Sequence, residues 1–242
     1  ISSDDGSTWM HSVVSSAPTG KIDLNIANGY IYATRSQISA LAVHYSNDDG
    51  QSWTYKPVTT GAPSFSAVPA GAAATTFTGG VILVVYSDSN DHYLKSAKSN
   101  DGGDTWTFQT IWTDGEAGNV NLISAGASVF VTLIDSGPFN AVGLFGLTND
   151  SGSSWSSFTN LDNSQRPDDL VFDGSEVAVS WAVSNGAPFF GVNDFSPNSW
   201  DRRGTGLGSI SPAVGTSIAV GASSGKFYFT AATNDGLWVS IP

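Results

Sequence analysis

The sequence predicts an all-β fold in which five repeats of about four antiparallel strands form one domain spanning residues 1–242. Three observations predict it. An eight-residue motif recurs along the chain, apolar residues fall in short runs separated by Gly, Asn, Asp and Pro, and no stretch keeps apolar residues at helical spacing over three turns. Because self-similarity over tens of residues is the signature of a repeat architecture, the motif is the stronger guide to the fold.

The motif has the form Ser-x-Asp-x-Gly-x-Ser/Thr-Trp, with Thr at the first position of one copy. Its copies end at Trp9, Trp53, Trp106 and Trp155, and a degraded fifth copy ends at Trp200. The Asp can accept hydrogen bonds from its own turn, the Gly can take a positive φ, and the Trp can pack as a large ring. We therefore expect structural hairpin turns. The residues assigned this role are Ser2, Asp4, Gly6, Trp9, Ser46, Asp48, Gly50, Trp53, Ser99, Asp101, Gly103, Trp106, Thr148, Asp150, Gly152, Trp155 and Trp200.

Between the first two motifs the pattern predicts strands at 10–15, 22–27, 30–34 and 41–45. Asn28-Gly29, lying between two apolar runs, is a strong hairpin signal. The same order recurs, with hairpin glycines at Gly29, Gly80, Gly126, Gly174 and Gly225. The runs after these glycines are 30–34, 81–86, 129–134, 177–183 and 227–231. Spacings of 51, 46, 48 and 51 between the glycines indicate five units.

The two chain ends predict how the units connect. The final predicted strand, 237–241, stops where its counterparts run into a motif, and the first motif lacks a preceding strand. We therefore predict that the C-terminal strand pairs with the N-terminal one, which leaves no open sheet edge. The result is a five-bladed β-propeller whose last blade is shared by both ends. Six thinner blades of roughly 40 residues are the alternative, which the five-fold counts disfavour.

Composition excludes several functions. The formal charge of −12 repels phosphate backbones and anionic lipid, so we expect neither nucleic-acid binding nor membrane insertion. The longest apolar run, 81–86, is too short to span a bilayer. The chain contains no cysteine, so it has no disulfide or thiol chemistry. We expect no cofactor and an extracellular or secreted location, with a cytoplasmic lectin as the alternative, whereas the oligomeric state stays open.

Metal and nucleophile motifs are also lacking. His11, His44 and His92 match no metal-ligand spacing, and no G-x-S-x-G elbow supports a catalytic triad. The motif acids faintly resemble calcium ligands, but no copy has the alternating oxygen ligands and the distal Glu of an EF-hand loop. We therefore expect no metal site and interpret these acids as turn residues.

Sugar binding is expected on the face opposite the motif turns, because recognition usually uses loops on a rigid scaffold. An aromatic ring flanked by Asp, Asn or Glu suits a sugar, whose C–H face stacks while its hydroxyls hydrogen-bond. The competing interpretation is that the rings fill the core and the loops are ordinary turns. The candidate ligand-binding residues are Trp112, Asp114, Glu116, Tyr86, Asp88, Asn90, His92, Trp181, Asn185, Arg35 and Arg166.

The four good motif copies resemble the Asp-box (BNR) repeat of sialidase-like β-propellers, and the resemblance covers the motif and the blade rhythm along the whole chain. It implies a propeller fold. Sialidase activity is not expected, because that family uses an arginine triad with an early F/Y-R-I-P segment. Here Arg35 lies in Ala-Thr-Arg-Ser, and the chain has only four arginines and two glutamates.

Three functions stay open at this stage. We favour a lectin similar to the propeller lectins of fungi and invertebrates, with several similar sugar sites that act through multivalency. A glycoside hydrolase would need a carboxylate pair roughly 5–10 Å apart. Its candidate acids are Asp23, Asp88, Asp114, Glu116, Asp135, Asp168 and Asp169. A protein-interaction platform would need a contiguous exposed apolar patch.

Overall fold

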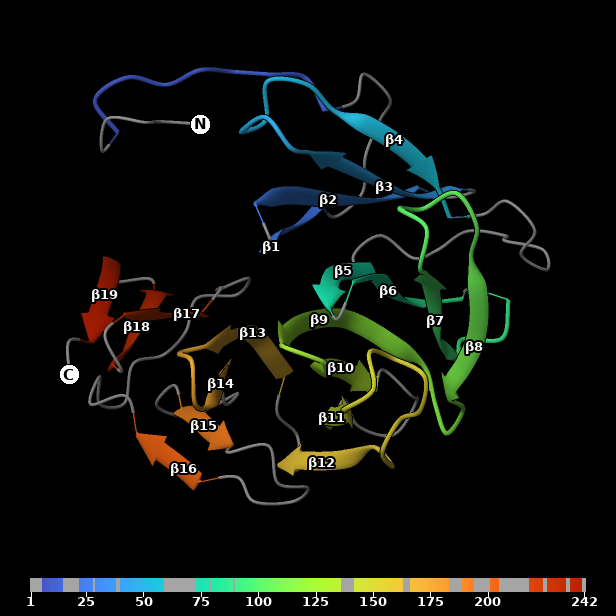
Figure 1. Ribbon diagram of the computed structural model, residues 1–242. Coiled ribbons are helices and arrows are strands. Elements are labelled where there is room, and N and C mark those ends of the chain that lie inside the picture. The colour runs from blue at the N-terminus through green and yellow to red at the C-terminus, as the bar shows by residue number, and fades with distance from the viewer. Residues whose placement is uncertain are drawn as a thin grey trace. The chain divides into compact units, whose positions relative to one another are not determined.

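The computed structural model describes residues 6–14, 22–27, 29–37, 40–58, 73–78, 80–88, 90–135, 142–162, 166–182, 189–193, 201–204, 218–223, 226–233 and 236–240. These residues form strands and turns and no helix. Among them, no helix is long and apolar enough to cross a membrane. The chain divides into two compact units, Ile1–Thr113 and Asp114–Pro242. Each unit consists of antiparallel sheets in which neighbours in sequence are neighbours in the sheet (Figure 1).

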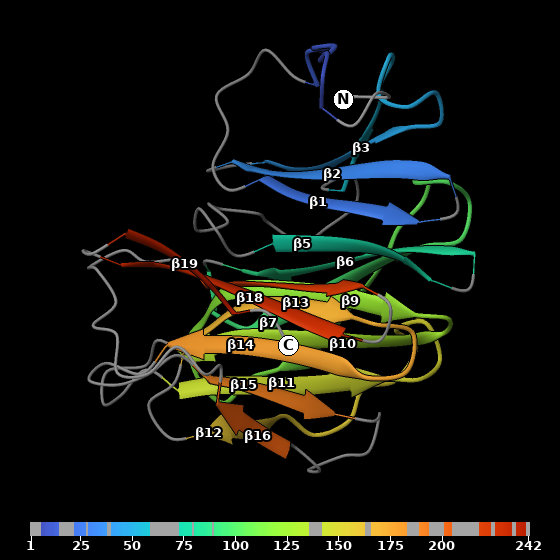
Figure 2. The ribbon, with the colours of Figure 1, turned by 90° about the vertical axis from the view of Figure 1, so that its left-hand side faces the viewer.

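The first unit holds two four-stranded sheets. One comprises β1 (Ile22–Ala27), β2 (Tyr30–Gln37), β3 (Ala40–Ser46) and β4 (Thr54–Pro57). The other comprises β5 (Ala73–Thr78), β6 (Val81–Ser87), β7 (Leu94–Ser99) and β8 (Thr107–Trp112). The first strands of the two sheets, β1 and β5, lie side by side (Figure 2).

The second unit holds three sheets. The first comprises β9 (Ala117–Ala125), β10 (Ser128–Asp135), β11 (Val142–Thr148) and β12 (Thr159–Asp162). The next comprises β13 (Arg166–Phe172), β14 (Val177–Ala182), β15 (Phe189–Asn193) and β16 (Asp201–Gly204). Among the described residues the last sheet has three strands, β17 (Ile218–Ser223), β18 (Lys226–Thr233) and β19 (Gly236–Ser240). Here β9 lies beside β13, and β13 beside β17.

The structure confirms the all-β prediction and the four-strand antiparallel unit. The motif copies at 46–53, 99–106 and 148–155 each connect the third strand of a sheet to its fourth. Gly29, Gly80, Gly126 and Gly174 all have positive φ in the turns after the first strands. Gly225 and most of the fifth motif lie outside the described residues.

The expected strand at 10–15 is not formed by the part of it that the structure describes, residues 10–14. The reason is that a strand exists only through hydrogen bonds to a neighbour, and this segment has no strand partner among the described residues. Three of its apolar side chains are exposed: Trp9 at 64%, Met10 at 56% and Val13 at 79%. The blade count and the pairing of the chain ends stay predictions.

Each unit has an apolar core between two of its sheets. In the first unit, Tyr32 and Val43 of one sheet pack with Ile82 and Val84 of the other. In the second, Phe130 and Phe145 pack with Val179, and the two rings lie 5.5 Å apart. Strand β6 is buried at every position, as expected for a strand covered on both faces. Burying one such side chain stabilises a fold by about 1.5–3 kcal/mol.

Candidate functional site

The three described motif aspartates, Asp48, Asp101 and Asp150, accept several hydrogen bonds within their own turns. In the second copy, Asp48 Oδ1 accepts hydrogen bonds from the Ser46 hydroxyl (2.7 Å) and the Ser52 backbone N–H (2.9 Å), and Oδ2 accepts from the Ser52 hydroxyl (2.5 Å). Ser46 Oγ in turn accepts from the Gly50 N–H at 2.7 Å. These bonds, led by that of the Ser52 hydroxyl, lower the pKa of Asp48 to about 2.

The copies around Asp101 and Asp150 repeat this hydrogen-bond pattern. In both, the hydroxyl donor at the seventh motif position contributes most to a lowered pKa of the aspartate. A carboxylate whose oxygens already accept several intraturn bonds is poorly placed to bind a ligand or to transfer a proton. The three described copies therefore share one hydrogen-bonded geometry, and their role as scaffold stays a prediction.

The motif tryptophans lie in unequal surroundings. Trp9 Nε1 donates to the Gly6 carbonyl at 3.0 Å, and Trp53 Nε1 donates to Ser12 Oγ at 3.1 Å. Trp106 packs against the core of the first unit. The buried indole nitrogens of Trp106 and Trp155 have no acceptor among the described residues. The environments of the described motif rings therefore differ from copy to copy.

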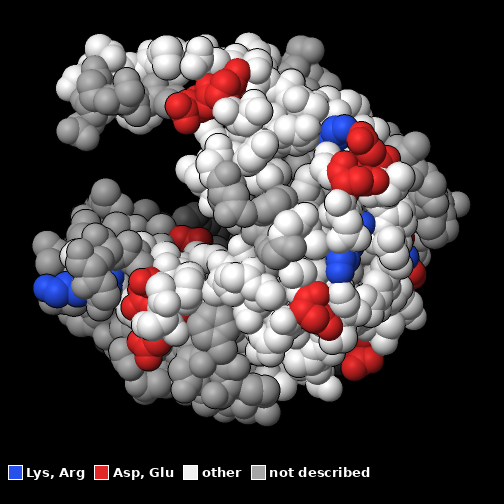
Figure 3. All heavy atoms as spheres, in the orientation of Figure 1, with Lys and Arg blue, Asp and Glu red and all other residues white. Residues whose placement is uncertain are grey.

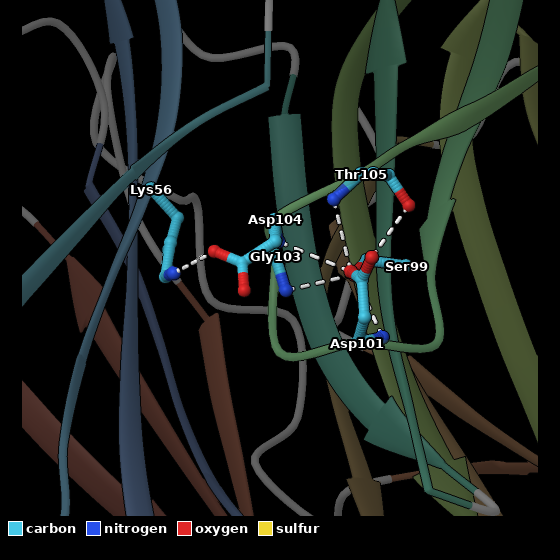
Figure 4. Close-up of polar contacts among 6 residues, drawn as sticks. All are labelled: Lys56, Ser99, Asp101, Gly103, Asp104 and Thr105. Atoms are coloured by element: carbon cyan, nitrogen blue, oxygen red, sulfur yellow. Dashed lines mark hydrogen bonds and ion pairs between the residues drawn. The ribbon is translucent and has the colours of Figure 1, made fainter.

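One motif turn is also clasped by the preceding sheet. The Lys56 ammonium pairs with Asp104, and a Cβ added at Gly103 would lie 2.9 Å from Lys56 Cγ (Figure 4). Gly103 has a φ of +90°, so glycine is required there for both its backbone conformation and the passage of the lysine stem. The hydrogen bond from Lys56 to Asp104 is the main cause of the raised pKa of that lysine.

Several residues expected to bind sugar are buried. The side chain of Trp112 is only 8% exposed, and its backbone pairs with that of Leu94 at the end of β8. Tyr86 is 2% exposed, and its burial raises the pKa of its hydroxyl. In this conformation neither ring offers a face for stacking. Their sugar-binding role stays a prediction, and Trp112 has the environment of the core filler that was the alternative.

The loop between β6 and β7 is held by a lysine between two carboxylates. Lys95 Nζ lies 2.6 Å from Asp88 Oδ2 and 2.7 Å from Asp91 Oδ2. Burial by itself would raise the pKa of Asp91, but Lys95 and the Tyr93 N–H outweigh it, so the pKa is lowered. Asn90 and His92 are exposed on this loop, and His92 has a φ of +61°. Asp88 is therefore a structural anion, whereas Asn90 and His92 are accessible.

Asp114 and Glu116 are exposed beside the start of β9. The Glu116 backbone N–H donates to Asp135 Oδ1 at 3.1 Å, so Asp135 fixes this corner. The remaining expected site residues fall outside what the structure describes. The side chains of Arg35, Arg166 and Trp181 and the whole of Asn185 belong to that group, as do Ser2, Asp4 and Trp200 of the motifs.

The first strands carry polar residues that the loop-centred interpretation did not select as its site. In the first unit they join the two sheets: Asp23 Oδ2 accepts from the Thr75 N–H at 3.0 Å. Asn25 Nδ2 donates to Thr76 Oγ1 at 3.3 Å, and the hydroxyls of Thr34 and Thr75 are hydrogen-bonded. Strands β1 and β5 pair with their hairpin partners in unbroken register. Hydrogen bonds between the two sheets therefore occupy these polar groups.

The corresponding strands of the second unit are bulged. The register of β9 shifts between Thr132 and Ile134 of its partner, and that of β13 shifts between Pro167 and Asp169. At the first bulge Asn119 has a φ of +45°, and its Nδ2 donates to the Pro167 carbonyl at 3.0 Å. Bulges are common beside active sites, where they redirect side chains, and a non-glycine residue with positive φ is itself unusual.

Register relates the two units. Asp23 and Asn121 occupy equivalent positions, each four residues before the last residue of its strand. Asp23 pairs with Thr34, and Asn121 pairs with Thr132. Asn119, Asn121 and Asp169 are half-buried residues, and the Nδ2 atom of Asn121 is itself buried. Two amides and a carboxylate therefore lie on two bulged strands that contact each other. Polar residues in the middle of otherwise apolar first strands were the sequence signal for it.

Each described carboxyl with a clearly shifted pKa is shifted downward: Asp48, Asp91, Asp101, Asp150 and Asp173. A general acid needs the opposite shift. No cluster of three metal-ligating side chains occurs among the described residues. The face in Figure 3 is mostly uncharged, with separate small acidic groups.

Comparison with known proteins places the fold. No family model and no curated protein matches the chain. Among solved structures, a thermostable family-43 glycoside hydrolase has a TM-score of 0.56 at 10% identity, covering 91% of this chain and 88% of its own. An endo-arabinase from Bacteroides thetaiotaomicron has a TM-score of 0.55 at 10% identity, covering 95% of each chain.

A third similar structure is the intramolecular trans-sialidase from Ruminococcus gnavus, with a TM-score of 0.56 at 14% identity over 88% of this chain and 54% of that one. The three likenesses are consistent with a β-propeller superfamily fold. At these identities they show the fold alone.

Proposed function

We propose that this chain is a carbohydrate-binding protein, a lectin on a propeller-type scaffold. Its principal sugar site lies at the adjacent bulges of β9 and β13. The observation that carries the proposal is the pair of bulges on two strands that contact each other, on which Asn119, Asn121 and Asp169 are half-buried. Amide and carboxylate groups suit sugar hydroxyls, because each hydroxyl both donates and accepts.

Similar scaffolds offer indirect support. A Xanthomonas citri GH43_1 enzyme was solved with xylose, and its structure matches this chain with a TM-score of 0.53 at 9% identity, covering 91% of this chain and 85% of its own. A scaffold of this kind can therefore hold a sugar. Because the first strands of the two units differ, we propose one main site in place of several equal ones.

Binding without hydrolysis fits the described carboxylates. Hydrolysis needs two of them at a defined separation, one with a raised pKa. Asp88 is paired with Lys95, Asp135 accepts from Glu116, and Asp23 accepts from Thr75. Asn121 has an amide at the register where Asp23 has a carboxylate. Strand β9 therefore has no carboxylate at the position where β1 has Asp23.

A glycoside hydrolase is the second candidate. Asp168 lies in the β13 bulge beside Asp169, so this strand supplies two acids. The family-43 hydrolases among the similar structures favour the same function. Release of reducing sugar from arabinan or xylan, abolished in Asp168→Asn or Asp169→Asn, would replace the lectin proposal with this one.

We also propose that the five sheets are the five blades of one closed propeller, in which the strand predicted at 10–15 pairs with the C-terminal strand. Support comes from the five hairpin glycines at near-equal spacing and from the fourth strand that the last sheet lacks among the described residues. A secreted location accompanies this proposal as an expectation.

A glycan array followed by titration calorimetry tests the lectin function. We expect binding to a neutral glycan, weakened about tenfold in Asn119→Ala through the loss of one hydrogen-bonding amide. Asn25→Ala is the matched control, because its amide, like that of Asn119, bridges two sheets but lies on a strand without a bulge, and the affinity of this variant should be unchanged. Absence of binding to every glycan, or equal loss in both variants, would overturn the proposed site.

A further inference from the structure

The motif copy at 148–155 contains a sequence that the other copies lack. Asn149-Asp150-Ser151 has the Asn-x-Ser/Thr form of an N-glycosylation acceptor, and it is the only such sequence in the chain. Asn47 and Asn100 occupy the place of Asn149 in the other two described copies, but the residues two positions later are Asp49 and Gly102. The hydroxyl at the fourth motif position therefore distinguishes this copy.

That hydroxyl residue has a backbone conformation that turn chemistry rarely gives to serine. Ser151 has a φ of +55°, the equivalent Asp49 also has +55°, and the equivalent Gly102 has +73°. Glycine takes this left-handed conformation without steric cost, and aspartate tolerates it because its short polar side chain can bond locally. Since the turn by itself favours glycine or aspartate, the serine points to a further role at this position.

The side chain of Asn149 is exposed, and its amide is anchored through the oxygen. Asn149 Oδ1 accepts a hydrogen bond from the Ser128 hydroxyl at 2.7 Å. Glycosylation replaces one hydrogen on Nδ2, so Oδ1 can keep this bond and hold the modified side chain in the same orientation. The adjacent hairpin turn presents the exposed small residues Gly126 and Ala127, and the Ala127 carbonyl accepts from the Ser151 N–H at 2.9 Å. Small side chains beside Asn149 leave space for a first sugar ring.

We infer that Asn149 is an N-glycosylation site. Nδ2 attacks the anomeric carbon of a lipid-pyrophosphate-linked oligosaccharide and loses one proton to a base of the transferase. The new N–C bond replaces the C–O bond to the pyrophosphate, which leaves with the electron pair. The inference rests on the secreted location expected for the chain, because the donor and its transferase belong to the secretory pathway. Ser151 is only 8% exposed in the folded turn, so the transfer precedes closure of that turn.

Asn149 lies at the end of its sheet that is remote from the β9 bulge. Ser128, its hydrogen-bond partner, is the first residue of β10, whereas the register shift falls between Thr132 and Ile134. A strand rises about 3.4 Å per residue, which separates Ser128 from Ile134 by about 20 Å. A glycan on Asn149 therefore starts at the motif end of the sheet and is compatible with the proposed sugar site.

Expression of the full chain behind a secretion signal in a eukaryotic cell line tests the inference. We expect intact mass spectrometry to show a single glycan, in the secreted and the cell-retained protein alike. Peptide-N-glycosidase should remove the glycan and convert the modified asparagine to aspartate, which peptide mapping should locate at Asn149. Protein without a glycan in both fractions, or a glycan at another residue, would overturn the inference.

Two matched variants separate the acceptor sequence from other sources of added mass. Ser151→Asp should abolish the glycan and keep the turn, because Asp49 has the same φ in the second copy. Asp49→Ser should add a second glycan, because it places a hydroxyl two residues after the exposed Asn47. Retention of the glycan in Ser151→Asp would contradict the inference. Neither mass measurement depends on sugar binding, so a failed lectin proposal and an absent glycan remain distinguishable.

Discussion

The two units use the same first-strand positions in opposite ways. In the first unit, the polar groups of β1 and β5 bond across the sheets: Asp23 holds the Thr75 N–H, and Thr34 holds the Thr75 hydroxyl. In the second unit, β9 and β13 are bulged, and the Thr132 hydroxyl has no partner among the described residues. A hydrogen bond also crosses between sheets in the second unit, from Asn119 to the Pro167 carbonyl, so the pair of bulges is what distinguishes the second unit from the first.

The largest expected effect comes from removing the hydrogen bond of Asp23 to Thr75, which joins the two sheets of the first unit. Asp23→Ala leaves a partly buried N–H of Thr75 without its acceptor, so we expect a loss of about 1–3 kcal/mol in the free energy of unfolding. Asp169→Ala is the matched change in the second unit, where Oδ1 accepts from the adjacent Leu170 N–H. Urea unfolding should show a smaller loss there, together with weakened sugar binding. Equal destabilisation by the two variants would remove the distinction between the units.

Acid should affect both units alike, because the motif turns are the same in each. The hydroxyl and backbone donors that surround Asp48 lower its folded pKa to about 2, and the pKa values of Asp101 and Asp150 are lowered too. A carboxyl with a depressed folded pKa stabilises the fold above its unfolded pKa, about 3.9, and the stabilisation is lost as pH falls through the folded value.

We therefore expect the urea midpoint to fall between about pH 5 and pH 2, because that range spans the unfolded and folded pKa values. Asp101→Asn and Asp150→Asn should each flatten the pH dependence by a similar amount. A flattened profile in one variant alone would show that the motif turns differ between the units. These carboxylates are solvent-exposed, so solvent screening keeps each contribution small.

The smallest effect is expected at the Lys56 clasp. The Asp104 side chain of this ion pair is exposed to solvent. Lys56→Met should therefore lower the free energy of unfolding by less than about 1 kcal/mol and should make stability less dependent on salt. Lys56→Ala also removes the stem that lies over Gly103, so it should cost more than Lys56→Met. Thermal unfolding at two salt concentrations measures both changes. A larger loss of stability in Lys56→Met than in Lys56→Ala would contradict the packing of the Lys56 stem over Gly103.

What the sequence predicted well is what short stretches encode. Alternating apolar runs and a positive-φ glycine placed β1 at residues 22–27, and the turn after it at Gly29. The strand expected at 10–15 failed because a strand also needs a partner distant in sequence. The bulges were missed because a single extra residue near Asn119 leaves the composition of β9 unchanged. The burial of Trp112 was not predicted for a related reason, since flanking polar residues do not reveal that a ring is buried.

The most direct test of the account is a crystal structure of the chain with the glycan that binds it best. We predict that the sugar contacts Asn119 and its neighbours at the bulged strands β9 and β13, while the motif turns keep their internal hydrogen bonds. A sugar bound against Asp48 and Trp53 would contradict the account, because it would make the repeated turn the site and the bulged strands the scaffold.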